Sequence, residues 1–325
     1  MADDEPAKVG EIDITEFEGK WSDVNFFLRR PHDVWVQEQI AYVPMWEAGT
    51  WVVDASDPAS PELLTHVEGR PFGEVASIPF DATDKESTEP PGNHHYAQAT
   101  ADGRVLAVGK ESWDAESGDD EGGPSGIELW DVSKPGSPIK LSEIHPPRAA
   151  DETRRGTWTT SHNFDIVGDR LYSSWYQGGV KIHDISDPGA PTELAWWREP
   201  ERAAFWSAVR ATEDVFVASA TGSGIAPNLT EGLFTFPTAP AEQASPPATP
   251  AAATPASSIA TARPTPTPTP TPTPSPTPSP TATEPPTTTE SDGQPGFGLL
   301  AGVAGVTAGL GWLRRRGGSE PSSRD

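Results

Sequence analysis

Three ten-residue segments decide the fold of this chain: Gly49-Thr-Trp-Val-Val-Asp-Ala-Ser-Asp-Pro58, Gly126-Ile-Glu-Leu-Trp-Asp-Val-Ser-Lys-Pro135 and Gly179-Val-Lys-Ile-His-Asp-Ile-Ser-Asp-Pro188. They share a glycine, a run rich in β-forming residues, an aspartate, a serine two residues later and a proline. A short apolar segment that begins at a second proline follows each of them, at Pro61, Pro138 and Pro191. Self-similar segments in series are the signature of repeat architectures.

A histidine opens another shared element upstream of each segment, in His32-Asp-Val-Trp, His95-Tyr-Ala-Gln and His162-Asn-Phe-Asp. This histidine precedes the aspartate of the repeat by 22 residues in the first and third copies and by 36 residues in the second copy. The excess of 14 residues matches the acidic, glycine-rich run from Glu111 to Pro124, which we interpret as a surface-loop insertion.

Each repeat predicts four short strands: one after the histidine, one through a segment such as Ile40-Ala-Tyr-Val43, one from the glycine to the aspartate, and one after the second proline. A four-stranded meander repeated in series is the blade of a β-propeller, so the predicted fold class is all-β, a propeller of about four blades. A degenerate fourth copy, with segments 205–209, 215–218 and 232–236, lacks the Asp-x-Ser-x-Pro turn and the outer strand.

The segment Pro6-Ala-Lys-Val-Gly-Glu-Ile12 aligns with the outer-strand segment Pro138-Ile-Lys-Leu-Ser-Glu-Ile144. Two interpretations follow. Either this first strand completes the unfinished fourth blade and closes a small ring, or the propeller is incomplete at its N-terminal side. The first residues contain neither a basic segment nor an apolar stretch, and therefore no secretion signal, which favours the second interpretation.

The repeats resemble the LVIVD repeat of surface-exposed bacterial and archaeal proteins, with Trp51-Val-Val-Asp54, Glu128-Leu-Trp-Asp131 and Lys181-Ile-His-Asp184 at the signature position. The resemblance covers about residues 1–236. It implies a propeller-like fold and an extracellular setting, and it implies no established activity. The predicted repeat domain spans residues 1–237.

Residues 238–291 are almost entirely proline, threonine, alanine and serine, and residues 264–281 alternate proline with threonine or serine. Such a segment cannot form a core or a sheet ladder, so we expect a disordered or polyproline II stalk that suits O-glycosylation.

Residues 292–325 combine the motif Pro295-Gly296-Phe297, an apolar run, and Arg314-Arg315-Arg316. We expect a transmembrane helix at about residues 296–313, with the three arginines inside the cell and the repeat domain outside. This tail resembles the PGF-CTERM sorting signal of archaeal surface proteins. The resemblance implies recognition by an archaeosortase, removal of the tail and transfer of the new C-terminus to a membrane lipid.

The chain has 48 acidic against 23 basic residues and a net charge of −25, and of its basic residues 7 are lysine and 16 arginine. Nucleic acid is therefore excluded as a partner, since nothing offsets phosphate repulsion. The composition resembles that of proteins from salt-loving archaea, whose carboxylate-rich surfaces stay soluble where salt screens their repulsion. The absence of cysteine excludes disulfides, thiolate metal sites and cysteine lipidation.

The histidines His32, His95 and His162 are candidate metal ligands, because equivalent positions in successive blades face the same central axis and imidazole is a common ligand. His94 and Asp33 could supplement them. Alternatively, these polar residues bond the backbone of a neighbouring blade, and the fourth copy has Trp206 in place of the histidine.

Other candidate residues have simpler explanations. The aspartates of the Asp-x-Ser-x-Pro turns, at Asp54, Asp131 and Asp184, are expected to bond the backbone of their own turns. Asn228-Leu-Thr230 is the only glycosylation sequon. No phosphate loop, dinucleotide motif or nucleophile elbow is present.

These observations predict a non-enzymatic cell-surface glycoprotein that is anchored to the cytoplasmic membrane and presents a propeller to surface proteins or glycans, with no cofactor. A metal-dependent extracellular enzyme that uses the blade histidines is the alternative. A structural member of the envelope, such as an S-layer component, is a third interpretation. The ligand of the propeller does not follow from its fold.

Overall fold

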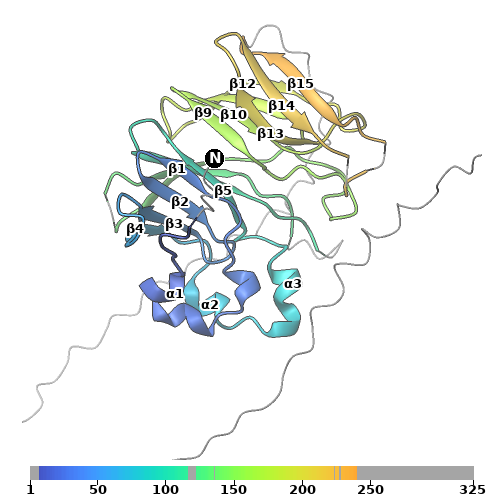
Figure 1. The fold of residues 1–325 in the computed structure, drawn as a ribbon. Coiled ribbons are helices and arrows are strands. Elements are labelled where there is room, and N and C mark those ends of the chain that lie inside the picture. Colours follow the sequence, from blue (N-terminus) through green and yellow to red (C-terminus); the bar gives the residue numbers. More distant parts are fainter. Residues whose placement is uncertain (1–6, 116–121, 135, 223, 227, 240–325) are drawn as a thin grey trace, which may run out of the picture. The chain divides into compact units, whose positions relative to one another are not determined.

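The computed structural model describes residues 7–115, 122–134, 136–222, 224–226 and 228–239. Four antiparallel sheets follow one another along the chain, and every strand pairs with its neighbours in sequence (Figure 1). The first sheet contains β1 (Trp35–Gln37), β2 (Ile40–Pro44), β3 (Thr50–Asp54) and β4 (Glu62–Val67). The second contains β5 (His94–Ala99), β6 (Val105–Lys110), β7 (Ile127–Asp131) and β8 (Ile139–Ile144).

The third sheet contains β9 (Phe164–Val167), β10 (Arg170–Ser174), β11 (Val180–Asp184) and β12 (Thr192–Trp197). The fourth contains β13 (Phe205–Arg210), β14 (Val215–Ala220) and β15 (Gly232–Pro237), with no outer strand among the described residues. The four antiparallel sheets confirm the all-β prediction. After β15, Thr238 bonds to the turn before β14.

Hydrophobic cores lie between consecutive sheets. Tyr42 and Val52 of the first sheet meet Leu106 of the second, and Phe164 of the third sheet packs edge-on against Tyr96 of the second with ring centroids 4.8 Å apart. The third and fourth sheets share a cluster of aromatic residues around Trp197 and Phe205. Face-to-face packing in chain order is the arrangement that the repeat predicted.

The predicted outer strand at Pro6–Ile12 is wrong. Residues 7–12 form no strand, and Val9 remains 71% exposed, so it has no sheet against which to pack. The fourth sheet is therefore not completed by this segment, and the interpretation of ring closure through it fails.

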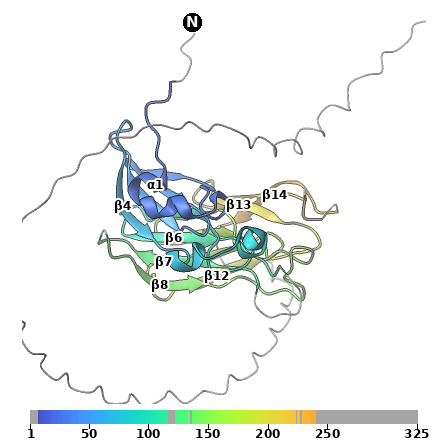
Figure 2. The ribbon, with the colours of Figure 1, turned by 90° about the horizontal axis from the view of Figure 1, so that it is seen from below.

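Six short helices lie at residues 14–28 and 72–86 of the described chain, and the repeat pattern predicted none of them (Figures 1 and 2). They are α1 (Ile14–Phe17), η1 (Gly19–Asp23), η2 (Phe26–Leu28), α2 (Phe72–Val75), η3 (Phe80–Ala82) and α3 (Thr83–Glu86), where η denotes a 3₁₀ helix. Buried Trp21 packs edge-on against Trp51 of β3, with ring centroids 6.2 Å apart. Helices this short are held by tertiary packing and not by their own propensity.

The repeat glycines allow the outer strand to approach closely. Gly49 and Gly179 have φ values of 82° and 93°, and a Cβ atom at these positions would lie 2.2 Å from the carbonyl oxygen of Val67 and 2.0 Å from that of Trp197. Val67 and Trp197 are the last residues of the outer strands β4 and β12. In the fourth sheet, Gly232 has no atom within 4 Å among the described residues, which include no outer strand at that position.

We predict that Gly179→Ala lowers the free energy of unfolding by about 2–5 kcal/mol, since a side chain is strained at this φ and clashes with backbone. Gly168→Ala is the matched control, because Gly168 also has positive φ, 59°, but no atom within 4 Å. Denaturant unfolding measures both variants. An equal loss of unfolding free energy in the two variants would show that the close approach of β12 to Gly179 contributes nothing to the effect.

Candidate metal centre

The three repeat histidines come together in space. His32 lies just before β1, His95 is the second residue of β5, and His162 lies just before β9. The ring centroids of His32 and His95 are 3.8 Å apart, and those of His95 and His162 are 4.4 Å apart. Equivalent positions of three successive sheets thus form one histidine cluster.

A carboxylate completes this cluster. One ligand atom each from His32, His95 and Glu111 lie within 4.8 Å of one another, and the His95 Nε2 atom is 3.5 Å from Glu111 Oε2. Glu111 directly follows β6 and is buried, as are the next two residues, Ser112 and Trp113. The prediction of a surface loop beginning at Glu111 is therefore wrong at its start. Trp113, an aromatic residue inside an acidic run, was the available signal that the run begins in the interior.

His162 adjoins the cluster with a fixed tautomer. Its Nδ1–H donates to the carbonyl oxygen of Trp206 at 2.5 Å, and its Nε2 is buried without a partner among the described residues. The lone pair of a neutral imidazole therefore lies on Nε2, which is the state that a metal ligand requires. Trp206, which replaces the histidine in the fourth copy, thus orients the histidine of the third.

Burial keeps the cluster histidines uncharged. Desolvation lowers the pKa of His162 to about 3, and it places the pKa of His95 well below its usual value, helped by the neighbouring histidines. Desolvation also lowers the pKa of His32. At neutral pH, protons therefore do not compete for these nitrogen atoms.

Burial has the opposite effect on the acid. It raises the pKa of Glu111 to about 7, against the hydrogen bond from Tyr176 and the charges of Arg154 and Arg30. The Tyr176 hydroxyl donates to Glu111 Oε1 and orients the carboxyl group. A bound cation would stabilise this carboxylate, which costs free energy when buried without one.

The donor set indicates which ions fit. Imidazole nitrogen and carboxylate oxygen suit zinc, copper, iron and nickel, and two histidines with one carboxylate and open positions are a known arrangement for iron(II). The nitrogen atoms His95 Nδ1 and His162 Nε2 have no partner among the described residues, so they are buried polar atoms that need one. The residues present therefore fit a divalent transition-metal ion.

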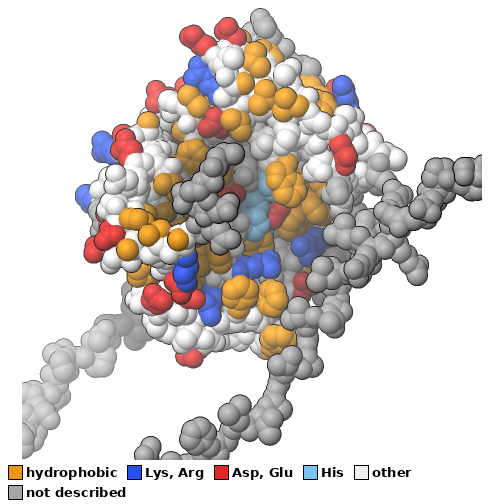
Figure 3. Space-filling view, in the orientation of Figure 1, with side chains coloured by type: hydrophobic (Ala, Val, Ile, Leu, Met, Phe, Trp, Pro, Cys, Tyr) orange, Lys and Arg blue, Asp and Glu red, His pale blue; other side chains and the backbone are white. Residues whose placement is uncertain are grey.

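The cluster opens into a pocket of about 590 Å³, which Glu111, exposed His32 and buried Trp46 help to line. Figure 3 shows histidine side chains at the bottom of a hollow, with arginine or lysine and hydrophobic side chains beside them. A structural metal site is normally closed by its ligands, whereas a catalytic site keeps an open position. The open access from the pocket to the histidine cluster is typical of a catalytic site.

His94 and Asp33, the supplementary candidates, are not in the cluster. The Nδ1 atom of His94 lies 2.9 Å from Thr50 Oγ1, and His94 is not among the grouped ligands. Asp33 accepts hydrogen bonds from the backbone of Val34 and from the side chain of Asn163.

The repeat aspartates bond their own turns, as the sequence predicted. Asp54, Asp131 and Asp184 each accept, through Oδ1, a hydrogen bond from the backbone N–H two residues later, at 2.8, 2.9 and 2.9 Å. Asn228 is exposed in the loop between β14 and β15, and its glycosylation stays a prediction.

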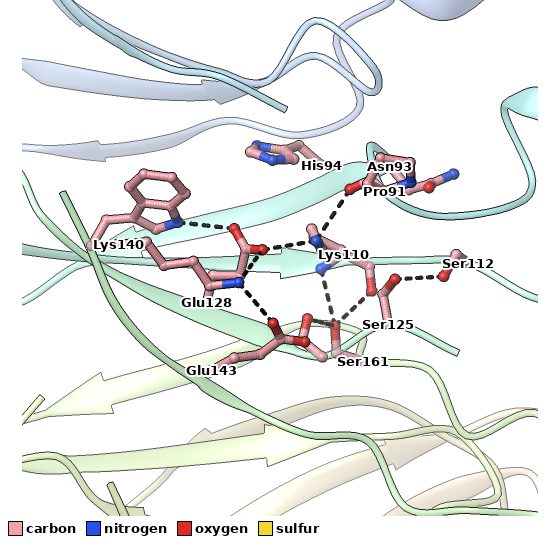
Figure 4. A network of polar contacts seen from close by, with 12 residues as sticks. Pro91, Asn93, His94, Lys110, Ser112, Ser125, Glu128, Lys140, Glu143 and Ser161 are labelled. Atoms are coloured by element: carbon pink, nitrogen blue, oxygen red, sulfur yellow. Dashed lines mark hydrogen bonds and ion pairs between the residues drawn. The ribbon is translucent and has the colours of Figure 1, made fainter. Parts of the chain in front are cut away.

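A buried ion network lies behind His94 (Figure 4). Glu128 Oε1 accepts from both Lys110 Nζ and Lys140 Nζ at 2.8 Å, and Glu128 Oε2 accepts from the indole of Trp130 at 3.0 Å. Lys110 also donates to the carbonyl oxygen of Pro91. Because every member has a partner, this network is a structural element of the second sheet and not a candidate site.

The predictions for residues 240–325 lie outside the described residues. They are the stalk beyond residue 239, the sorting motif Pro295-Gly296-Phe297, the span 296–313 and the arginines Arg314, Arg315 and Arg316. Among the residues that are described, no helix has the length and apolar character needed to cross a membrane.

Comparison with known proteins gives one family match, to the LVIVD repeat, over residues 29–68. This segment contains His32 and the whole first sheet. No curated protein matches the chain.

Solved structures similar to this chain include a computationally designed protein, Ika4, at 11% identity and TM-score 0.39, covering 64% of this chain and 90% of that protein. The RRP9 WD40 repeats match at 12% identity and TM-score 0.40, over 64% of this chain and 51% of that one. The β-propeller domain of Cps50 (Swd1) from Myceliophteria thermophila matches at 10% identity and TM-score 0.38, over 62% and 54%. The chain thus spans about half the length of these two natural neighbours, carries an LVIVD repeat at residues 29–68, and has β-propellers among its structural neighbours.

Proposed function

We propose that this protein binds a divalent transition-metal ion through His32, His95 and Glu111, with His162 as a further ligand, and that it is a metal-dependent enzyme acting on a small molecule in the adjoining pocket. The observation that carries the proposal is the 4.8 Å grouping of the three ligand atoms beside a pocket of about 590 Å³. Two buried imidazole nitrogens without partners among the described residues support it.

Metal analysis tests the proposal directly. The full chain is purified from cells that were supplied with zinc, copper, iron, manganese and nickel together. We expect it to retain about one ion per chain, as measured by elemental mass spectrometry. Folded protein that neither retains nor takes up any of these ions would overturn the proposal.

The second candidate is the non-enzymatic binding protein of the cell surface or envelope. Solvent-exposed apolar side chains on described strands, Val36 of β1 and Val209 of β13, favour it, since such side chains can contact a partner. Surface proteins or glycans are the partners proposed for this function. Persistence of partner binding in metal-free protein would distinguish it from the first candidate.

Surface display is proposed for either candidate. The support is the sequence of the tail: Pro295-Gly296-Phe297, an apolar run and Arg314-Arg315-Arg316 after a proline-rich and threonine-rich segment. An archaeosortase-type enzyme is the proposed processing partner, and the acidic composition supports a salt-loving archaeal host.

We predict that protein isolated from the envelope of its host ends near Pro295 and carries a lipid, as read by mass spectrometry of its C-terminal peptide. In Phe297→Ala the tail should remain on the protein, while Phe26→Ala, an exposed phenylalanine far from the motif in the sequence, should not affect processing. An intact Arg314-to-Arg316 tail on wild-type protein found in the cytoplasm would contradict the proposed sorting.

A further inference from the structure

Two arginines line the pocket beside the candidate metal centre without a close ion pair to any acid of the described residues. Arg30 and Arg154 both line it, and neither guanidinium has a carboxylate oxygen within 4.0 Å among the described residues. The chain has 48 acidic against 23 basic residues, so its composition favours the pairing of every arginine. Two unpaired guanidiniums in one pocket therefore indicate an anionic ligand.

Aromatic rings hold both guanidiniums in place. The Arg30 Cζ atom lies 5.1 Å from the ring centroid of Trp46 and 5.8 Å from that of Phe27, and the Arg154 Cζ atom lies 5.0 Å from that of Trp113. A guanidinium that stacks through its face keeps the N–H groups of its edge free. These groups form the planar fork that matches a carboxylate.

The pocket is also lined by three acids, Asp81, Asp84 and Glu111, none of which forms an ion pair within 4.0 Å with either guanidinium. Asp81 and Asp84 come from η3 and α3, whereas Arg30 and Arg154 act electrostatically on Glu111 of the candidate metal centre. The positive charge of the two arginines therefore acts on the part of the pocket next to the histidine cluster, where a ligand would contact the ion.

The apolar lining limits the shape of the ligand. Trp46 is buried, while Phe27 and Phe80 are 50% and 81% exposed, so these two rings can cover a ligand that enters from solvent. A volume of about 590 Å³ accommodates one small organic molecule.

We propose that this pocket binds a planar organic carboxylate. Arg30 and Arg154 hold the carboxylate, and the aromatic side chains of Trp46, Phe27 and Phe80 contact the flat apolar body. The inference rests on the proposed function for the role of the ion, and it names the substrate class of that site.

Isothermal titration of the full, metal-loaded chain with 2-naphthoate tests the proposal, at one fixed salt concentration. Neutral 2-naphthamide has the same ring system without the charge, and inorganic phosphate has the charge without the ring. We expect naphthoate to bind more tightly than either. Arg30→Gln and Arg154→Gln should each weaken naphthoate binding by about 10-fold or more, the usual loss when a charge-assisted hydrogen bond is removed.

Arg202→Gln is the matched control, because Arg202 also stacks on an aromatic ring, at 5.6 Å from the centroid of Phe234, but is outside the pocket. It should bind naphthoate like the wild type. Circular dichroism establishes that each variant is folded, and a variant that does not fold is replaced by the lysine variant, which keeps the charge but loses the planar fork.

The outcomes separate this inference from the proposed function. Metal-loaded protein that does not bind naphthoate, binds naphthamide equally well, or is unaffected by both arginine variants overturns the inference and leaves the metal centre intact. Tighter binding of phosphate with the same arginine dependence overturns the planar organic class. Folded protein that takes up none of the metal ions but still binds naphthoate through the arginines overturns the proposed function and supports the carboxylate pocket.

Discussion

Simultaneous replacement of His95 and His162 by alanine should lower the metal affinity of the protein by more than about 100-fold, because loss of a residue that merely supports a ligand already costs 10-fold to 100-fold. The change removes two imidazoles, each of which has one ring nitrogen without a partner among the described residues. Metal content and a competition titration with a chromogenic chelator measure the effect. Glu111→Gln should give a smaller loss in the same direction, since an amide oxygen is a weaker ligand than a carboxylate.

Controls come from histidines outside the cluster. His145 is exposed, and His94 contacts Thr50 and is outside the ligand group, so His145→Ala and His94→Gln should keep the metal. Equal metal content in the double variant and the wild type would contradict the assignment of the centre. Loss of the metal in His145→Ala would show that the ion is bound elsewhere.

Replacement of Glu128 by alanine should lower the free energy of unfolding by about 3–5 kcal/mol, the usual cost of leaving a buried charge without its partner. Lys110 is 8% exposed, and in this variant the carbonyl oxygen of Pro91 would be the one hydrogen-bond acceptor left to its ammonium group among the described residues. Glu143→Ala is the control, because Glu143 is more exposed and contacts Lys140 at the edge of the network, where an ion pair contributes about 1 kcal/mol or less.

The pH dependence of stability gives a second measurement of the same carboxylate. Burial alone would raise the pKa of Glu128, but Lys110, His94 and Lys140 hold it at about 2, below the ordinary value of 4.5. Because the pKa of Glu128 is depressed in the folded state, the contribution of this carboxylate to the free energy of unfolding is complete above about pH 4.5. It is lost as the pH falls toward 2. In Glu128→Gln this part of the acid destabilisation should disappear, and an unchanged acid profile would contradict the assigned role.

The sequence predicted the structural features that recur in every repeat and missed those that occur once. The strands and the turn aspartates follow from the repeat, because each copy must place the same alternating side chains between two neighbouring sheets. The helices at residues 14–28 and 72–86 occur once, and Trp21 and Val75 stabilise them only through contact with the first sheet. Propensity within such short segments carries too little information to predict them.

Part of the candidate site could also be predicted. Equal spacing placed His32 and His162 at equivalent positions, and the structure brings them together with His95. Glu111 was missed because it belongs to one copy only, at the start of an insertion. The orienting contacts of Trp206 and Tyr176 arise between sheets, so no spacing within one repeat could reveal them.

The strict pairing of each strand with its neighbours in the chain also bears on how the protein folds. Short turns join most paired strands, so each sheet can form with little loss of chain entropy on closing its loops. Because the hydrophobic cores lie between consecutive sheets, neighbouring sheets can assemble one after another, as in other repeat arrays. Since His32, His95 and His162 belong to three such units, the histidine cluster can exist only after all three have docked, and it reports the last step of their assembly.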